Sequence, residues 1–275
     1  MTNTRGTDTQ APPVVGYTFD NATPEAGRQV RLLADILDGH TTQVLAREGV
    51  EDGRYCLDLG AGAGTVSTWL AKHVGPTGRV VAVDLDPRHI PHHDLVEVRI
   101  GDVTTMYLGT DLYDVIHARL LLMHLPDRVR VLQRIVAALK PGGVLVVSEW
   151  DCTHPEDMLV RAADGVADAF VAFQKTLIGL SVERGMDAAW ARVLPVAMRD
   201  AGLQDVTEEP YNRVWAGGQS GCLLHASNSR QKEPELLARG ITADQLDTVR
   251  TAMQRPDTLA WSYPMVTAVG HRADH

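Results

Sequence analysis

The sequence predicts an α/β fold in which buried parallel strands alternate with helices. Residues 55–59 form a short apolar run, as in strands covered on both faces. Three glycines at alternate positions of Gly60–Gly64 follow, and they let the backbone turn sharply and approach a ligand. Helical spacing over 65–74 and a second apolar run over 79–83 complete a strand, loop, helix and strand. Because Asp84 then stands at the edge where open α/β sheets bind ligands, the unit is predicted to be a nucleotide-binding half-fold.

The residues around the loop distinguish between ligands. A dinucleotide fingerprint would place its last glycine at Thr65, but here it comes one residue earlier, at Gly64. Asp58 precedes the loop, and a carboxylate there would repel a diphosphate but suit an ammonium group. The chain also has no Tyr-x-x-x-Lys pair. A zwitterionic nucleoside bearing a sulfonium is therefore favoured, and an NAD-dependent oxidoreductase is the less favoured alternative.

The pattern Asp58-x-Gly60-x-Gly62-x-Gly64 followed by Asp84 resembles the cofactor signature of class I S-adenosylmethionine (SAM) dependent methyltransferases. Further stretches up to about residue 150 agree with it: Gly101–Val103, Tyr113–Arg119 and Leu139–Gly143. The whole chain is also similar to actinobacterial-type small-molecule (secondary-metabolite) methyltransferases. This resemblance implies a Rossmann-like sheet of seven strands, five parallel plus an antiparallel C-terminal pair, with N-terminal and inserted helices forming a cap.

The resemblance also implies SAM as the cofactor and assigns residues to it. Asp58 and the backbone of Gly60, Ala61, Gly62 and Gly64 would hold the methionine moiety. Asp84 would accept from the ribose hydroxyls, and Leu85 would pack on the adenine. Asp102 and Val103 would read the adenine edge, and Ala118 and Arg119 would approach the methionine end. A turn or helix-capping role is the alternative for each carboxylate.

The predicted organisation along the chain has five parts: a disordered tail at 1–12, an N-terminal helical lid at 13–49, a SAM-binding core at 50–151, a helical insert at 152–202, and C-terminal strands of the core at 203–275 with a helical insert at 217–260. Within the lid we expect a helix over 25–37, a break at 38–40 and a second short helix over 41–47. The last two strands are expected at 203–214 and 263–270.

Transfer to a hydroxyl would be helped by a base, and His124 is the first candidate because it follows the fourth strand and titrates near neutrality. Glu149, Asp151, His154 and His225 are its rivals, and a structural histidine is the alternative. Predicted substrate-pocket residues follow from position and from the aromatic character of small-molecule pockets: Tyr17, Phe19, Trp150, His154 and His225.

Composition excludes several classes of partner. Lys and Arg total 26 against 35 Asp and Glu, giving a net charge of −9, and without a basic stripe no nucleic-acid partner is expected. The apolar runs are of strand length, so no membrane association is expected. The odd cysteine number, 3, indicates a reduced, cytoplasmic compartment. Pro91 interrupts the histidines of 89–93, so they predict a solvated loop, and no metal is expected. A metal held by Glu149 and Asp151 is a minor alternative.

The predicted function is methyl transfer from SAM to a small molecule, with oxygen favoured over nitrogen or carbon as acceptor. A SAM-binding cyclase or a non-catalytic SAM-binding protein on the same fold is the alternative. The natural substrate and the choice between monomer and homodimer stay open, because no motif addresses either.

Overall fold

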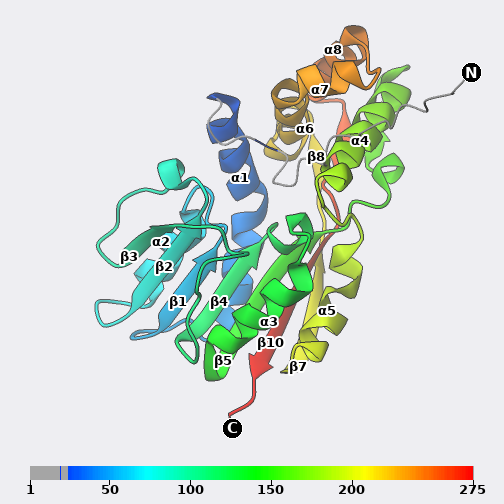
Figure 1. Ribbon diagram of the computed structural model, residues 1–275. Helices are drawn as coiled ribbons and strands as arrows, with labels where there is room; N and C mark the ends of the chain where they lie inside the picture. Colours follow the sequence, from blue (N-terminus) through cyan, green and yellow to red (C-terminus); the bar gives the residue numbers. More distant parts are fainter. Residues whose placement is uncertain (1–18, 20–23, 275) are drawn as a thin grey trace, which may run out of the picture.

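Seven strands form one mixed sheet in the order β3-β2-β1-β4-β5-β10-β7 (Figure 1). The computed structural model describes Phe19 and residues 24–274, so Tyr17 and the predicted tail lie outside the described residues. The strands of this sheet are β1 (Tyr55–Leu59), β2 (Arg79–Asp84), β3 (Val96–Ile100), β4 (Tyr113–Arg119), β5 (Leu139–Trp150), β7 (Leu203–Tyr211) and β10 (Met265–Arg272). The first five pair in parallel, and β10 runs antiparallel to both β5 and β7. This confirms the predicted fold class.

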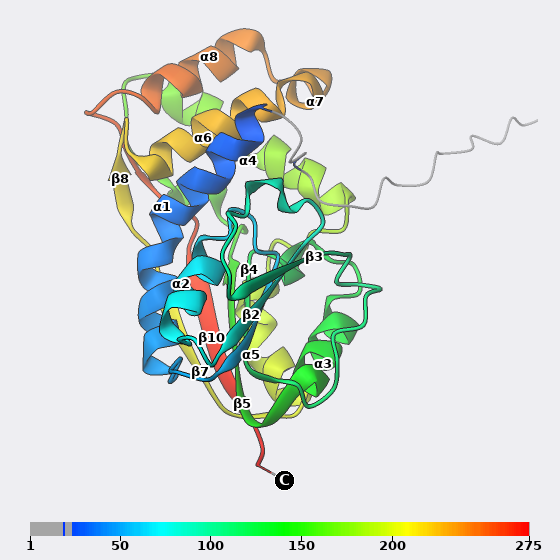
Figure 2. The same ribbon diagram turned by 90° about the vertical axis from the view of Figure 1, so that its left-hand side faces the viewer.

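Helices cover both faces of the sheet (Figure 2). On one face lie α1 (Pro24–Arg47) and α2 (Thr65–His73), whose Val44 and Leu70 belong to the same buried cluster as Val80 of β2. On the other lie α3 (Arg128–Ala138) and α5 (Trp190–Asp200), whose side chains share a cluster with Leu57 and Leu145. The strands β1, β2, β4 and most of β5 are buried. This burial explains why apolar residues dominate their sequences.

The remaining helices form a cap beyond one end of the sheet, at the top of Figures 1 and 2. They are α4 (Val166–Glu183), α6 (Ser220–Gln231), α7 (Glu233–Ala238) and α8 (Ala243–Ala252). A second sheet of three short strands joins the cap in the order β6 (Leu159–Arg161), β9 (Leu259–Trp261) and β8 (Val214–Ala216). This sheet is not predicted from the sequence, because strands of three residues leave too little alternation to detect. Within the described residues, single-turn 3-10 helices occur at η1 (Pro87–His89), η2 (Leu122–His124) and η3 (Pro155–Asp157).

The predicted break at residues 38–40 is wrong, because α1 runs without interruption from Pro24 to Arg47. Tertiary contacts hold the helix where its sequence is weakest. Asp38 accepts a hydrogen bond from Arg119 of β4 at 2.9 Å, and His40 Nε2 lies 2.9 Å from Thr267 Oγ1 of β10. The His40 ring also stacks on Tyr211 of β7 with centroids 4.5 Å apart. Contacts with three strands thus override the helix-breaking tendency of Gly39.

Two further findings concern the residues that the structure describes. No helix among them is both long enough and apolar enough to span a bilayer. The thiols of Cys56, Cys152 and Cys222 are all free and buried. Burial raises the pKa of the Cys56 thiol to about 12 and that of Cys222 to about 11, so both stay protonated at neutral pH.

The continuous α1 makes a testable prediction at Gly39, which is exposed in the helix interior with open space where a Cβ would stand. Gly39→Ala should raise the free energy of unfolding by about 0.5–1 kcal/mol, because alanine loses less backbone entropy in a helix. Urea denaturation measures the change. Gly49→Ala is the matched control, and it should destabilise the protein because Gly49 has a φ of 72°. A loss of stability in Gly39→Ala would contradict a continuous helix.

Candidate active site

The loop from Gly60 to Gly64 joins β1 to α2 at the carboxyl edge of the sheet. Gly60, Gly62 and Gly64 have φ values of 67°, 55° and 68°, a region that residues with a side chain rarely adopt. A Cβ on Gly64 would lie 2.7 Å from Ile90 Cγ2. The amides of Gly60 and Ala61 donate to the carbonyl of Val83 in the next strand, at 2.9 and 3.1 Å. The glycines are therefore required by the backbone path itself.

Asp84 fixes the other side of this loop. Its Oδ2 accepts from the Gly62 amide at 2.8 Å, and its Oδ1 accepts from the Asp86 amide at 2.9 Å. Each carboxylate oxygen has two lone pairs, so both keep a site for a ligand hydroxyl. Asp102, after β3, accepts at Oδ1 from the amide and hydroxyl of Thr104 at 2.8 and 2.7 Å. Asp102 therefore has the turn role that was its alternative assignment, and its other carboxylate oxygen, Oδ2, takes no part in this turn.

The side chain of Asp58 is buried inside the protein. It is 2% exposed and lies between β1, β4 and α2. His117 Nδ1 lies 2.8 Å from Asp58 Oδ1, and the Ser67 hydroxyl donates to Oδ2. Both partners come from elements that pack on β1, so these bonds tie the start of the glycine loop to β4 and α2. The predicted contact of Asp58 with a ligand stays a prediction.

Arg119 joins the end of β4 to α1. Its guanidinium donates to Thr41 Oγ1 at 2.8 Å and to Asp38 Oδ1 at 2.9 Å, both on α1. The Asp38 carboxylate therefore neutralises this cation at the edge of the site. Leu120, the next residue, has a φ of 52°, which is strained for a leucine. Such a turn redirects the chain at the point where it leaves the sheet.

The turn η2, which carries His124, is held from two sides. The buried Glu149 Oε1 accepts from the amides of Leu122 and Met123 at 2.7 and 3.3 Å. Arg128 donates to the carbonyl of Leu122 at 3.3 Å and to that of Gly185 at 2.5 Å. Burial raises the pKa of Glu149 to about 8, against the opposite effect of these amides. The carboxyl is therefore mostly protonated at neutral pH, and its Oε2 has no hydrogen-bond partner among the described residues.

A cavity of about 580 Å³ runs along this edge and beneath the cap. We call its first part the cofactor half; its described wall is Gly60, Ala61, Gly62, Ala63, Thr65, Val83, Asp84, Leu85, Gly101, Asp102, Val103, Thr104, Arg119, Leu120 and Leu121. We call its second part the acceptor chamber; its described wall is Phe19, Gln29, Val30, Leu33, Met123, His124, Leu125, Pro126, Asp127, Trp150, Cys152, Leu177, Ile178, Ser181, Met186, Leu224, Asn228 and Tyr263.

The two halves contain most, but not all, of the residues predicted from the sequence. Gly64 and Ala118 do not line the cavity, although each lies directly beside a residue that does. His154 is also outside it, on the surface with its Nδ1 3.3 Å from Glu156. His225 lies behind the chamber, where it packs edge-on against Phe170 and bonds Gln174 at 2.6 Å. Among the predicted substrate-pocket residues, Phe19 and Trp150 form part of the wall.

His124 lies in the chamber wall, half-buried. Removal from bulk water, with a smaller effect of the Arg128 cation, lowers the pKa of His124 to about 4. The imidazole is therefore neutral at physiological pH. A neutral imidazole can accept a proton, as a general base must, but the lowered pKa also makes it a weaker base than an ordinary histidine.

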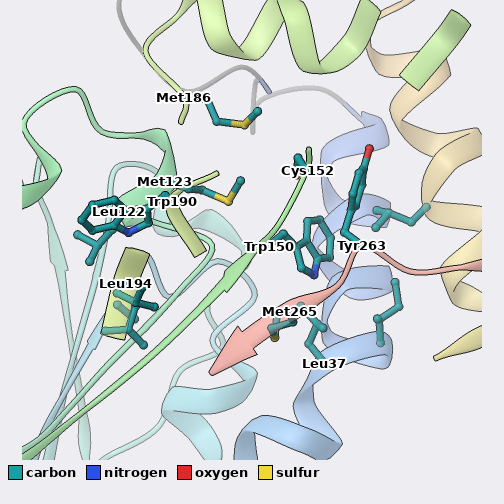
Figure 3. Close-up of a cluster of buried hydrophobic side chains, with 14 of the residues drawn as sticks. Leu37, Leu122, Met123, Trp150, Cys152, Met186, Trp190, Leu194, Tyr263 and Met265 are labelled. Atoms are coloured by element: carbon teal, nitrogen blue, oxygen red, sulfur yellow. The ribbon is translucent and has the colours of Figure 1, made fainter. Parts of the chain in front are cut away.

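The aromatic side chains of the chamber wall contact each other and the cap helices. Trp150 and Tyr263 lie against each other with ring centroids 5.1 Å apart (Figure 3). The Tyr263 hydroxyl donates to Gln174 Oε1 of α4, and Gln174 in turn contacts His225 of α6. Burial raises the pKa of Tyr263 well above its ordinary value, so the phenol stays neutral. This chain of contacts fixes the Tyr263 ring relative to two cap helices.

Several chamber residues were not found from the sequence. Gln29 of α1 and Asn228 of α6 line it and bond each other, with Gln29 Nε2 donating to Asn228 Oδ1 at 2.8 Å. Neither residue belongs to a motif, and 199 positions separate them. Tyr263 was available as an aromatic at the start of the last predicted strand. Only the folded cap shows that these side chains meet.

Two other candidates from the sequence were Asp151 as the base and a metal site. Asp151 bonds Arg192 and Thr153, both at 2.6 Å, and it does not line the cavity. No group of three or more His, Cys, Asp or Glu side chains within the described part of the chain could hold a metal ion.

A glycine loop and a strand-end acid at the carboxyl edge of a parallel sheet, beneath a helical cap, define a Rossmann-like protein with a nucleotide-type ligand site. Residues 29–208 match the methyltransferase domain family. Because this match covers more than half of the 275 residues, the chain belongs to that family.

The chain is also similar to individual curated proteins. An uncharacterised 37.1 kDa protein in transposon TN4556 of Streptomyces fradiae is 31% identical over 210 residues, 69% of this chain and 60% of that protein. Methyltransferase GfsG of Streptomyces halstedii is 28% identical over 186 residues, 64% of each chain. The matches thus span less than two thirds of these curated relatives.

Solved structures share the fold. Phosphoethanolamine N-methyltransferase 2 of Haemonchus contortus, in complex with phosphomonomethylethanolamine and S-adenosylhomocysteine, superposes with a TM-score of 0.57. It is 16% identical, and the alignment covers 94% of this chain and 61% of that one. At this identity the likeness concerns the fold.

The protonated Glu149 predicts how stability depends on pH. The folded state keeps this proton up to about pH 8, whereas the unfolded carboxyl releases it near 4.5. Its contribution is therefore complete below pH 4.5 and is lost as the pH rises towards 8. Glu149→Gln cannot lose a proton, so between pH 5 and 8 wild-type stability should fall relative to this variant by up to about 1.4 kcal/mol per pH unit.

Urea titrations at pH 5, 6, 7 and 8 measure this difference. Glu156→Gln is the control, because Glu156 is exposed and its pKa is lowered. Its stability should parallel that of wild type over the same range. Parallel curves for wild type and Glu149→Gln would show that the buried carboxyl is ionised in the folded protein.

Proposed function

We propose that this protein transfers a methyl group from SAM to a small-molecule acceptor, with oxygen as the accepting atom. The observation that carries the proposal is the single cavity, whose cofactor half opens into the acceptor chamber. A volume of about 580 Å³ suits small-molecule ligands. Donor and acceptor would meet near Arg119 and His124, where the two halves join.

The residues of the cofactor half fit SAM. The positive-φ glycines allow close backbone approach, and the free lone pairs of Asp84 can accept from two ribose hydroxyls. Leu85 is 62% exposed on the cavity wall, as a side chain that packs on a base would be. Asp102 and Val103 are placed to contact the base edge. SAM supplies an electrophilic methyl group on a sulfonium.

The protein's own contribution to the reaction would be orientation, exclusion of water and proton transfer. The apolar chamber shields the acceptor from water and limits its possible orientations. A hydroxyl becomes a better nucleophile when it loses its proton, and the neutral His124 imidazole can take it up. Glu149 and Arg128 act through η2, because their bonds hold the turn that presents His124.

The choice of an oxygen acceptor rests on His124, since an amine or an acidic carbon has less need of a base. Placement in secondary metabolism stays a prediction from the resemblance. The alternative, a SAM-binding cyclase or non-catalytic protein, differs in its product. Mass spectrometry of a screened acceptor should show the gain of a methyl group, whereas an isomerised product of unchanged mass would favour the alternative.

Asp84 provides the test of the cofactor site. Asp84→Asn should weaken S-adenosylhomocysteine binding by about 10- to 100-fold, because a charged acceptor for two hydroxyls is lost. Isothermal titration calorimetry measures the affinity. Asp94→Asn is the control, since Asp94 is exposed and does not line the cavity. Failure of folded wild type to bind either SAM or S-adenosylhomocysteine would refute the proposal.

His124 provides the test of the chemistry. With a hydroxyl acceptor found by screening, His124→Gln should lower kcat by about 100-fold or more, the usual contribution of a general base. S-adenosylhomocysteine affinity should stay within about twofold, because His124 belongs to the other half of the cavity. His154→Gln, on the surface, is the matched control. Unchanged kcat in His124→Gln would remove His124 as the base.

A further inference from the structure

The acceptor chamber is nearly free of charge, and this property bears on which molecules it can hold. We propose that the acceptor is an uncharged, largely apolar molecule with a planar ring and an oxygen that accepts a hydrogen bond from Asn228. This inference rests on the proposed function and adds the chemical class of the substrate to it.

The described wall of the chamber contains four ionisable side chains: His124, Asp127, Cys152 and Tyr263. Three of them are neutral at physiological pH, because burial lowers the pKa of His124 to about 4 and raises the pKa values of Cys152 and Tyr263. Asp127 is the fourth, and it is exposed at the first residue before α3. No described residue within the chamber wall therefore presents a buried charge to a ligand.

Cations beside the chamber are already paired. Arg119 lies in the neighbouring half of the cavity, where its guanidinium bonds Asp38 of α1. Lys232 lies 5.8 Å from the centre of the Phe19 ring, and its ammonium donates to Glu235 at 3.1 Å. An ionic ligand in the chamber would lose its hydration without gaining a counter-ion, which disfavours it strongly over a neutral ligand of the same shape.

The shape and polarity of the wall favour a ring with few polar groups. Trp150 and Tyr263 offer adjoining aromatic surfaces, and Tyr263 is held in place through Gln174. Aromatic surfaces of this kind contact planar rings well. Leu177 and Met186 add aliphatic surface.

Asn228 is the residue that we expect to form a hydrogen bond with the acceptor, and its pairing with Gln29 shows which of its atoms are available. Asn228 Oδ1 accepts from Gln29 Nε2 and keeps one lone pair, so Asn228 can offer a ligand its side-chain nitrogen as a donor and this lone pair as an acceptor. Asn228 is only 5% exposed and lines the chamber. A buried amide donor selects for a carbonyl, ether or hydroxyl oxygen.

A set of three probes that share one ring and differ in charge tests this inference. They are 2-naphthol, 2-naphthoate and 2-naphthylmethylammonium. Calorimetric titration at pH 7 into protein saturated with S-adenosylhomocysteine should give an affinity for 2-naphthol at least tenfold higher than for either ion. Saturation is verified first, so that a failure of the proposed cofactor site is recognised separately.

Two variants locate the probes in the chamber. Ile178 lines it and is only partly buried, so Ile178→Glu places a carboxylate in the wall with limited disturbance of packing. This change should weaken 2-naphthol binding at least tenfold and make the ammonium probe the preferred one. Val193→Glu is the control, since Val193 is 48% exposed on α5 and lies outside the cavity. It should leave all three affinities unchanged.

In protein that binds S-adenosylhomocysteine, three results would overturn the inference. One is equal or tighter binding of either ion to wild type. Another is the absence of 2-naphthol binding. The third is an unchanged order of affinities in Ile178→Glu, which would place the probes outside the chamber.

Discussion

Strands β1, β2, β4 and β5 are covered by helices on both faces, and this burial confines polar chemistry to their ends. A charged side chain within such a strand must find a partner inside the protein, as Asp58 does with His117 and Ser67. Side chains that follow the strands are free of this constraint. Asp84, Asp102 and Arg119 all stand at that edge, and so does the turn with His124. Burial of the strands therefore explains why the candidate site lies at this edge of the sheet.

The same constraint explains which parts the sequence could predict. The glycine loop and Asp84 are separated by a single helix and strand, so local spacing was enough to place them together. The strands over residues 55–59 and 79–83 were likewise predictable from apolar runs, whereas the seven-stranded sheet and its cap were implied by the family resemblance. Asp58 differs, because a carboxylate two residues before a glycine loop can face a ligand or the protein interior. Only the positions of His117 and Ser67 decide between these two environments.

Other features depended on contacts between distant segments. The helix α1 continues through Gly39 because Arg119, Thr267 and Tyr211 hold its middle turn, and none of these residues is near it in sequence. The chamber wall is of the same kind. Gln29 comes from helix α1, Trp150 from the end of β5 and Tyr263 from the loop between β9 and β10, without shared spacing. A sequence pattern can thus indicate the residues of the cofactor half far better than those of the acceptor chamber.

The bond between Gln29 and Asn228 joins residues 199 positions apart, and it has a consequence for how the protein folds. Contacts of such long range form late, because the chain must lose much entropy before they are made. The glycine loop and Asp84 need only about thirty consecutive residues, the size of one strand-helix-strand unit. If these thirty residues form first, the chain would have the glycine loop and Asp84 in place before the acceptor chamber exists. Such an intermediate would leave the apolar residues of the chamber open to water, and these would be the surfaces through which it aggregates or engages a chaperone.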